Sequence, residues 1–345
     1  MARRHTRAAI AALAAALVVA AQLLRFGAAL ALSVELAVPR AESWLTRLGP
    51  EPVREEIAIA VGGRRLDADL YWPSRPRSAI LLVHGLSRAG RRQPELVRLA
   101  RLLARQHELV LVPAFEGLAA FRLSGREVEE VRSALRYLTR LSDSVSVAGF
   151  SFGGYADLRN VVAYATTGAY SFDGRHYQGR QEEYNRWKLL ALLAGFVNGR
   201  RDRGLLAMIA AAKLADPAAP TARLERQLGD EGRRVMALAL NRREAAVGGL
   251  LAGLPRRAGD AVDRLSPLRV VSRLPGRLLI GHGVDDDSIP FTESLRLADA
   301  AGGRAQVAVL QTFNHIGPDA VWRSLRLRAV DGWNLFRLAD ALLPH

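Results

Sequence analysis

Short apolar runs alternate with longer stretches of helical periodicity along most of the chain. Two runs at 56–61 and 66–72, separated by Gly62-Gly63, predict an antiparallel hairpin. Strands alternating with helices predict an α/β fold with a mainly parallel sheet flanked by helices. The later apolar runs predict buried strands at 79–83, 109–112, 144–148, 278–281 and 306–310, with helices at about 94–106 and 125–141.

The middle of the chain departs from this alternation. A polar, aromatic stretch at 168–187 precedes the apolar run 189–197, which we expect to be the next strand. The following segment is rich in Ala, Leu and Arg with helical periodicity, and several prolines break it. It is longer than one strand and two helices require. We therefore predict a helical insertion at about 198–270, within one large domain at 39–345.

A candidate nucleophile lies in Gly149-Phe150-Ser151-Phe152-Gly153, which follows the apolar run 144–148 and precedes a predicted helix. A strand, a sharp turn that carries serine, and a helix together form a nucleophile elbow. The flanking glycines permit a strained turn, which we expect to expose the Ser151 hydroxyl for acyl transfer. Such a pentapeptide arises by chance in about one chain in eight, so it indicates a nucleophile only where a base and an acid accompany it.

Histidine and aspartate occur later in the chain, in the order that such a site requires. Of the seven histidines, His315 fits the base because it follows the predicted strand 306–310 in a loop that would leave the sheet edge. Three candidate acids follow the strand at 278–281, and they are Asp285, Asp286 and Asp287.

The stretch from His282 to Pro290 resembles the H-G-x-x-D-x-x-[VI]-P stretch of the α/β-hydrolase family. This resemblance implies that Asp286 is the acid, and that Asp285 and Asp287 are solvated loop carboxylates. A second resemblance, at His84-Gly85, implies an oxyanion hole built from the backbone N–H groups of Leu86 and Phe152. His84 would then hold the loop in place, and Ser87 could replace Leu86 as donor by a shift of one position.

The resemblance covers about residues 55–343 and implies a serine hydrolase that cleaves a small-molecule ester through an acyl-enzyme, with no cofactor. The insertion at 198–270 would form a cap over the site, although it could also simply complete the scaffold. The 168–187 stretch could line the pocket or pack as a surface loop. A peptidase, a thioesterase and a non-catalytic, membrane-tethered binding protein remain as alternatives.

The composition also bears on nucleic-acid binding, metal binding and disulfide formation. The net charge is +15, but the arginines are spread along the whole chain without a recognition motif, so nucleic-acid binding is not expected. His176 has no second ligand at a metal-binding spacing, and we find no metal signature elsewhere in the sequence. The chain has no cysteine and therefore no disulfide. Its oligomeric state cannot be predicted from these features.

The N-terminal region, 1–38, indicates a membrane anchor or a signal segment. Arg3, Arg4 and Arg7 precede an uncharged apolar run at 8–24, which is close to the length of a spanning helix and could extend or tilt through 26–38. The arginine cluster would stay cytoplasmic, which places the catalytic domain outside the cytoplasm. Cleavage after Ala29-Leu30-Ala31 would instead give a soluble secreted or periplasmic enzyme.

Overall fold

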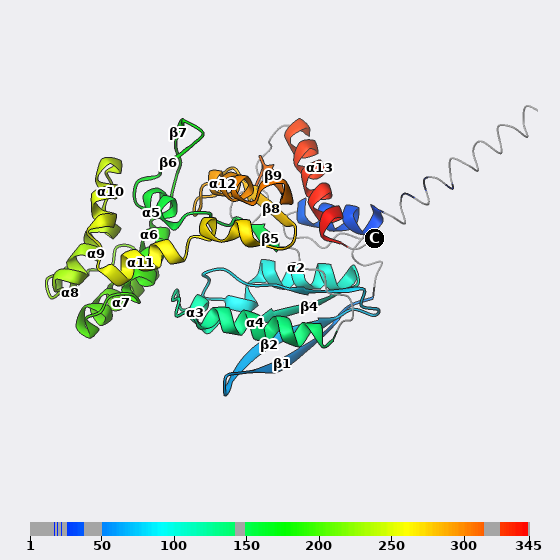
Figure 1. Cartoon of the computed structure of the whole chain (residues 1–345), viewed down its shortest axis with the longest axis horizontal. Helices are drawn as coiled ribbons and strands as arrows, with labels where there is room; N and C mark the ends of the chain where they lie inside the picture. Colours follow the sequence, from blue (N-terminus) through cyan, green and yellow to red (C-terminus); the bar gives the residue numbers. More distant parts are fainter. Residues whose placement is uncertain are drawn as a thin grey trace, which may run out of the picture.

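The computed structural model describes residues 17, 19, 22, 26–37, 50–141, 149–313 and 325–343. Two sheets and their flanking helices lie at one end of the molecule, and a group of helices forms the other end (Figure 1). The predicted strand at 144–148 lies outside the described residues, and the description resumes at Gly149.

The first sheet has the strand order β1-β2-β4-β3. The predicted hairpin is confirmed, because β1 (Val53–Val61) and β2 (Arg64–Trp72) pair antiparallel around Gly62-Gly63, whose φ angles are 52° and 78°. Both angles lie in the left-handed region that favours glycine. The sheet continues with β4 (Glu108–Pro113), which is antiparallel to β2 and parallel to β3 (Ser78–Leu81).

Helices cover both faces of this sheet because β4 alternates its apolar side chains between them. Val110 and Val112 pack against α2 (Pro94–Arg105), whereas Leu109 and Leu111 pack against α4 (Arg126–Thr139). A strand buried on both faces reads as a continuous apolar run, as the sequence does here. Shorter helices join these elements at η2 (Gly90–Arg92) and α3 (Glu116–Ala119).

The second sheet is entirely parallel, with the strand order β5-β8-β9. Its strands are β5 (Gly149–Phe152), β8 (Leu278–Gly283) and β9 (Ala305–Leu310). One face packs against α12 (Thr292–Ala301) and the other against α13 (Leu325–Leu342). The helix η5 (Gly302–Arg304) connects α12 to β9. Together the two sheets confirm the predicted α/β class.

The predicted strand at 189–197 is wrong, because α6 (Glu183–Ala194) occupies most of it. Leu189, Leu190, Leu192 and Leu193 are all buried in a core formed by several helices. A helix that is buried on all sides gives the same continuous apolar run as a buried strand, so periodicity alone cannot distinguish them.

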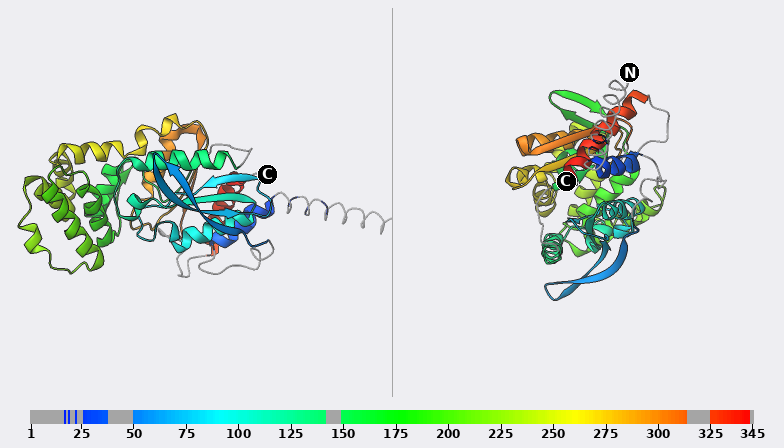
Figure 2. Two further views of the ribbon diagram at one scale, coloured as in Figure 1. Left: turned by 90° about the horizontal axis from the view of Figure 1, so that it is seen from below. Right: turned by 90° about the vertical axis from the view of Figure 1, so that its right-hand side faces the viewer.

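The segment predicted as a helical insertion is helical over most of its described length. Its helices are α7 (Arg200–Ala215), α8 (Ala222–Glu225), α9 (Asp230–Leu240), α10 (Glu244–Ala252), α11 (Arg256–Arg264), η3 (Pro267–Arg269) and η4 (Val271–Arg273). The views in Figure 2 place α7 to α10 at one end of the molecule, away from both sheets.

Residues 26–37, which we call the N-terminal helical segment, pack onto the folded domain. Ala29 and Leu32 are buried in the core that α2 and α13 share, and Glu35 forms an ion pair with Arg98 at 3.3 Å. This part of the N-terminal region is therefore not a membrane-exposed extension of the run at 8–24. Of the helices formed by described residues, none combines the length and the hydrophobicity needed to cross a bilayer.

Candidate active site

Ser151 lies within β5, where it is in register with Ile280 of the neighbouring β8. The predicted elbow is therefore only partly correct. Strand, turn and helix follow in the expected order, but Gly153 takes the left-handed conformation, with φ 62°, and α5 (Leu158–Thr167) begins later. Because Gly153 makes the turn, Ser151 keeps an extended backbone and needs no strained conformation of its own.

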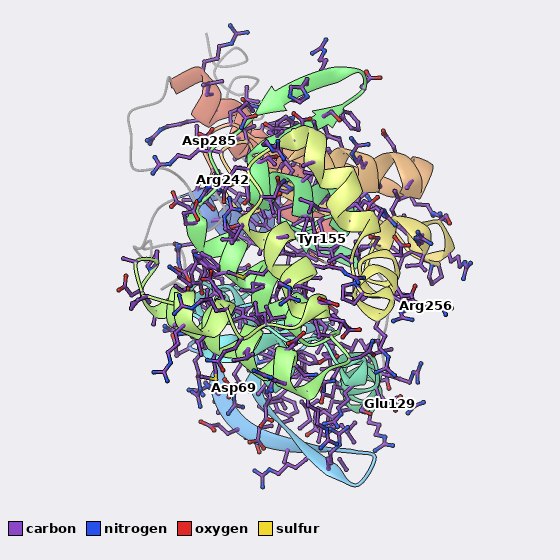
Figure 3. All side chains as sticks on the ribbon, turned by 90° about the vertical axis from the view of Figure 1, so that its left-hand side faces the viewer. Asp69, Glu129, Tyr155, Arg242, Arg256 and Asp285 are labelled. Carbon is purple, nitrogen blue, oxygen red and sulfur yellow. The ribbon has the colours of Figure 1, made fainter. Side chains whose placement is uncertain are left out.

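The Ser151 side chain lies on the wall of an open pocket of about 560 Å³. A Cβ atom added to Gly154 would overlap the Ser151 hydroxyl, so the absence of a side chain at position 154 leaves room for it. Tyr155, labelled near the middle of Figure 3, donates a hydrogen bond from its hydroxyl to the Leu265 carbonyl at 2.9 Å. Apart from Arg273, the rest of the lining is mostly apolar and includes Pro267, Val270, Val271, Leu274 and Leu297.

Among the three candidate acids, Asp286 is the buried one, with 4 % of its surface exposed. Its Oδ1 accepts hydrogen bonds from the backbone N–H groups of Ser288 and Ile289 at 2.8 and 2.9 Å. Asp285 is exposed, and Asp287 is half-buried. The family resemblance selects Asp286 over its two neighbours, and Asp286 is also the most buried of the three.

His282 is a contact of Asp286 that the sequence analysis missed. Its Nε2 lies 3.3 Å from Asp286 Oδ2 and 3.0 Å from the Ile289 carbonyl oxygen, and its Nδ1 lies 2.6 Å from Ser294 Oγ. The ring is fully buried with both nitrogens engaged, so it positions the acid and has no nitrogen left for a substrate. The sequence signal for this contact is that His282 lies four residues before Asp286.

The candidate base, His315, lies outside the described residues, but the loop that leads to it begins within them. The Asp331 carboxylate of α13 accepts hydrogen bonds from the backbone N–H groups of Gln311 and Thr312 at 2.8 and 2.7 Å, and from Thr312 Oγ1 at 2.7 Å. Asp331 is buried, so this carboxylate fixes the start of the loop from the core side.

Phe313 connects this loop to the other two. Its carbonyl accepts a hydrogen bond from the Asp285 N–H at 3.3 Å, and its ring lies 6.4 Å from the Phe152 ring, centroid to centroid. The residue after Ser151, the residue before Asp286 and the residue two positions before His315 are therefore neighbours. The structure brings the nucleophile and acid segments to one edge of the second sheet, at the end where ligands bind in α/β folds.

Glu293 of α12 fixes the turn that follows Ser151. Its carboxylate accepts hydrogen bonds from the N–H groups of Ala156 and Asp157 at 3.2 and 2.8 Å, and from Asn160 Nδ2 at 2.8 Å. Burial raises the pKa of this carboxyl, while the hydrogen bonds oppose the shift. The sequence offered no signal for this contact, because Glu293 is distant from the turn along the chain.

The candidate oxyanion donor Leu86 follows β3 in a loop that His84 holds. His84 is buried; its Nε2 accepts a hydrogen bond from the Phe115 N–H at 3.2 Å, and its Nδ1 donates to the Gly85 carbonyl at 2.9 Å. Burial lowers the pKa of this imidazole, with the Gly85 bond acting in the opposite direction. These contacts agree with the predicted structural role of His84. The donor roles of Leu86 and Phe152 stay predictions.

The aromatic residues of the 168–187 stretch are absent from the lining of the Ser151 pocket, and Tyr170 and Tyr177 pack near the acid loop. A hairpin of β6 (Ala169–Phe172) and β7 (Arg175–Gln178) stacks Tyr170 on Tyr177, with ring centroids 5.0 Å apart. Tyr170 also contacts Tyr164, whose hydroxyl donates to the Asp286 carbonyl at 3.1 Å. Burial raises the pKa of Tyr164, with a smaller contribution from Asp286. Of the two interpretations left open, packing is the one observed.

Lys188 is another residue that the sequence analysis did not single out. Its Nζ lies 4.5 Å from the centroid of the Tyr184 ring, and burial lowers its pKa although Asp287 and Asp286 oppose the shift. Within the described ranges, no group of three histidine, aspartate or glutamate side chains is arranged to hold a metal ion. His176 instead lies 3.4 Å from Glu244, where both side chains are exposed.

Comparison with known proteins identifies no family model and no curated protein that matches the chain. Matching solved structures include Pyrococcus horikoshii acylaminoacyl peptidase (13 % identity, 85 % of this chain, TM-score 0.44), of which the chain spans only 40 %. An esterase domain from a Rhodothermus marinus protein matches at 15 % identity over 85 % of this chain and 100 % of that domain, with TM-score 0.40. The 2,6-dihydroxy-pseudo-oxynicotine hydrolase matches at 15 % identity over 85 % of this chain and 68 % of that protein, with TM-score 0.42.

The names of these three structures all describe hydrolases. All three TM-scores are below 0.5, so we base no fold, residue role or substrate on these matches.

Proposed function

We propose that the chain is a serine hydrolase of carboxylic esters with Ser151 as nucleophile, His315 as base and Asp286 as the acid that orients the base. The observation that carries this proposal is the meeting of three loops at Phe313, which contacts Phe152 and accepts a hydrogen bond from Asp285. His315 follows Phe313 by two residues. The order of nucleophile, acid and base along the chain is that of α/β-hydrolases.

In the proposed reaction, Ser151 Oγ attacks the acyl carbonyl carbon while His315 takes the hydroxyl proton. The N–H groups of Leu86 and Phe152 stabilise the oxyanion that forms, and one such donor contributes roughly 10²–10³ in rate. The intermediate then collapses, the C–O bond to the alcohol breaks, and His315 protonates the leaving alkoxide. Water, deprotonated by His315, attacks the acyl-enzyme and releases the carboxylic acid with Ser151 restored.

An apolar acyl group suits the wall on which Ser151 lies. Val271, Leu274 and Leu297 contribute aliphatic side chains to a pocket of about 560 Å³, which is within the range of small-molecule sites. Arg273 is the one charged residue among those that line the pocket, so a heavily hydroxylated acyl group would leave most of its polar groups without hydrogen-bond partners there. We therefore propose aliphatic acyl esters ahead of peptides.

Fluorophosphonate labelling tests the mechanism, because only an activated serine reacts. We expect wild-type protein to be labelled, Ser151→Ala and His315→Ala to lose the label, and Ser171→Ala and His176→Ala to keep it as matched controls. Ser171 and His176 lie on the exposed β6–β7 hairpin. Short and long p-nitrophenyl esters, with a p-nitroanilide and a thioester beside them, then rank ester against amide and thioester hydrolysis. Absence of labelling in folded wild-type protein would refute the assignment and favour a binding protein.

For localisation, we propose a membrane-attached protein that keeps its N-terminal region and holds the catalytic domain outside the cytoplasm. Cleavage after Ala31 would remove Ala29, which is buried, and Phe26, which contacts Phe336. The mass of the exported protein tests this proposal: we expect the full chain, and a mature N-terminus at Leu32 would contradict it.

A further inference from the structure

The helix α13 presents two different faces. One face carries Leu335, Leu338 and Ala339, which are buried against the second sheet and α2. The other face consists of Arg326, Val330, Trp333 and Arg337, spaced at four, three and four residues, and we call this set the α13 face. Trp333 is 61 % exposed and Val330 is 46 % exposed, so the fold itself does not bury them.

Aromatic contacts connect the α13 face to the N-terminal helical segment. The Trp333 ring stacks on Phe336 with centroids 5.5 Å apart, and the Phe336 ring meets Phe26 edge to face at 5.8 Å. Phe26 is the first residue of the N-terminal helical segment, and Leu30 on that segment is 45 % exposed. Apolar exposure therefore extends from α13 to the place where the upstream chain joins the domain.

Upstream of this segment, beyond Arg25, lies the uncharged apolar run at 8–24. The three described residues of this region, at 17, 19 and 22, are helical and exposed, and Leu17 and Val19 have 62 % and 57 % of their surface accessible. An apolar sequence therefore precedes the N-terminal helical segment that contacts the α13 face.

Arg326 and Arg337 flank the apolar centre of the α13 face. Both are exposed, and neither forms an ion pair with an acidic side chain in the described part of the chain. Tryptophan favours the interface between headgroups and acyl chains, where arginine meets lipid phosphates. A second copy fits this charge pattern poorly, because antiparallel pairing of two α13 faces would bring Arg326 of one copy beside Arg337 of the other.

We propose that the α13 face lies on an anionic lipid surface, with Trp333 and Val330 at the headgroup level and Arg326 and Arg337 on lipid phosphates. The proposal adds a second membrane contact to the attachment proposed above and does not depend on hydrolase activity. It also orients the domain, because α13 and the helices α7 to α10 lie at opposite ends of the molecule (Figures 1 and 2). The insertion would then point away from the membrane.

Single-cysteine labelling of the full chain tests the proposal directly, since the sequence has no cysteine. Val330→Cys on α13 and Met208→Cys on α7 carry an environment-sensitive fluorophore; both replaced side chains are apolar and exposed, at 46 % and 55 %. On phosphatidylglycerol-containing vesicles we expect blue-shifted emission and quenching by lipid-borne nitroxides at position 330, with no change at 208. Circular dichroism confirms folding of each labelled protein.

The charge requirement has a separate readout. Arg326→Gln and Arg337→Gln should each weaken this contact about five-fold on anionic vesicles, and have little effect on phosphatidylcholine vesicles. Equal responses at 330 and 208 would overturn the proposal, as would vesicle-bound protein with no quenching at 330, or protein that does not bind vesicles. Emission at 330 that shifts with protein concentration in the absence of lipid would identify a second copy as the occupant. Fluorophosphonate labelling reports independently on the hydrolase assignment.

Discussion

The loops of the candidate active site and the helices of the insertion are held in place by different interactions. Three buried carboxylates, on Asp286, Glu293 and Asp331, accept hydrogen bonds from backbone N–H groups of loops at the edge of the second sheet. The helices from α6 to α11 share an apolar core, and their buried charges, Arg186 and Asp202, bind at helix ends. Carboxylates thus fix the position of reacting groups, whereas apolar packing fixes the relative positions of helices.

The largest effect on stability should come from Arg186, which is fully buried and donates to the carbonyls of Thr166, Ala239 and Asn241. Arg186→Met leaves these buried acceptors unpaired, and we expect the free energy of unfolding to fall by about 3 kcal/mol. Urea unfolding measures it. The matched control Arg256→Met, on an exposed arginine of α11, should change stability by less than about 0.5 kcal/mol. Equal effects would mean that Arg186 adds nothing to the packing of the helices.

Asp331→Asn should separate activity from stability at the active-site loops. The asparagine amide group would face N–H donors at Gln311 and Thr312, so we expect kcat to fall roughly ten- to a hundred-fold with little change in KM. Stability should fall by about 1–2 kcal/mol. Asp299→Asn on the exposed side of α12 is the control. An Asp331→Asn protein with wild-type kcat would show that the loop keeps its position without this carboxylate.

Glu293 predicts a pH dependence. Burial raises its pKa in the folded state above the usual value of 4.5, so the folded protein holds this proton more tightly than the unfolded chain. Ionisation therefore costs stability as pH rises from about 4.5 through the raised pKa, and each tenfold difference in proton affinity between the two states costs about 1.4 kcal/mol. Melting temperatures of wild type and Glu293→Gln across this range measure the effect. We expect the variant to lose this decline, and parallel curves for the two proteins would contradict the assignment.

The smallest effect should be at the exposed pair of His176 and Glu244, which are 3.4 Å apart. His176→Ala removes a solvent-screened contact between the β6–β7 hairpin and α10, and we expect a change in stability below about 0.5 kcal/mol at any pH. Thermal unfolding at pH 5 and 8 checks it. A clear loss at pH 5 alone would mean that ion pairs, in addition to apolar packing, attach the insertion to the rest of the domain.

Much of the fold could be predicted because local patterns and tertiary structure agree. Gly62-Gly63 marks the β1–β2 turn, and the apolar run at β4 is a strand buried on both faces. The strand prediction at 189–197 was wrong because a helix and a strand give the same apolar pattern when they are buried on all sides. Periodicity carries no information about which of the two a buried segment forms.

The candidate site was predictable to the extent that its residues follow strands. Asp286 follows β8, a strand that the sequence predicted, whereas Ser151 lies within β5, where the sequence predicted a turn. The contacts of His282, Glu293 and Asp331 join elements whose relative positions depend on helix packing, and no local motif encodes that packing. The backbone turn at Gly153 in place of Ser151 likewise depends on the pairing of β5 with β8.

The contact between Ser151 and Gly154 has a consequence for how this sequence can change. A side chain at position 154 would occupy the space of the Ser151 hydroxyl, so a substitution there affects the orientation of the nucleophile. The nucleophile is therefore coupled to its neighbour three residues away, and a variant that fills position 154 while keeping Ser151 must move the serine to another rotamer.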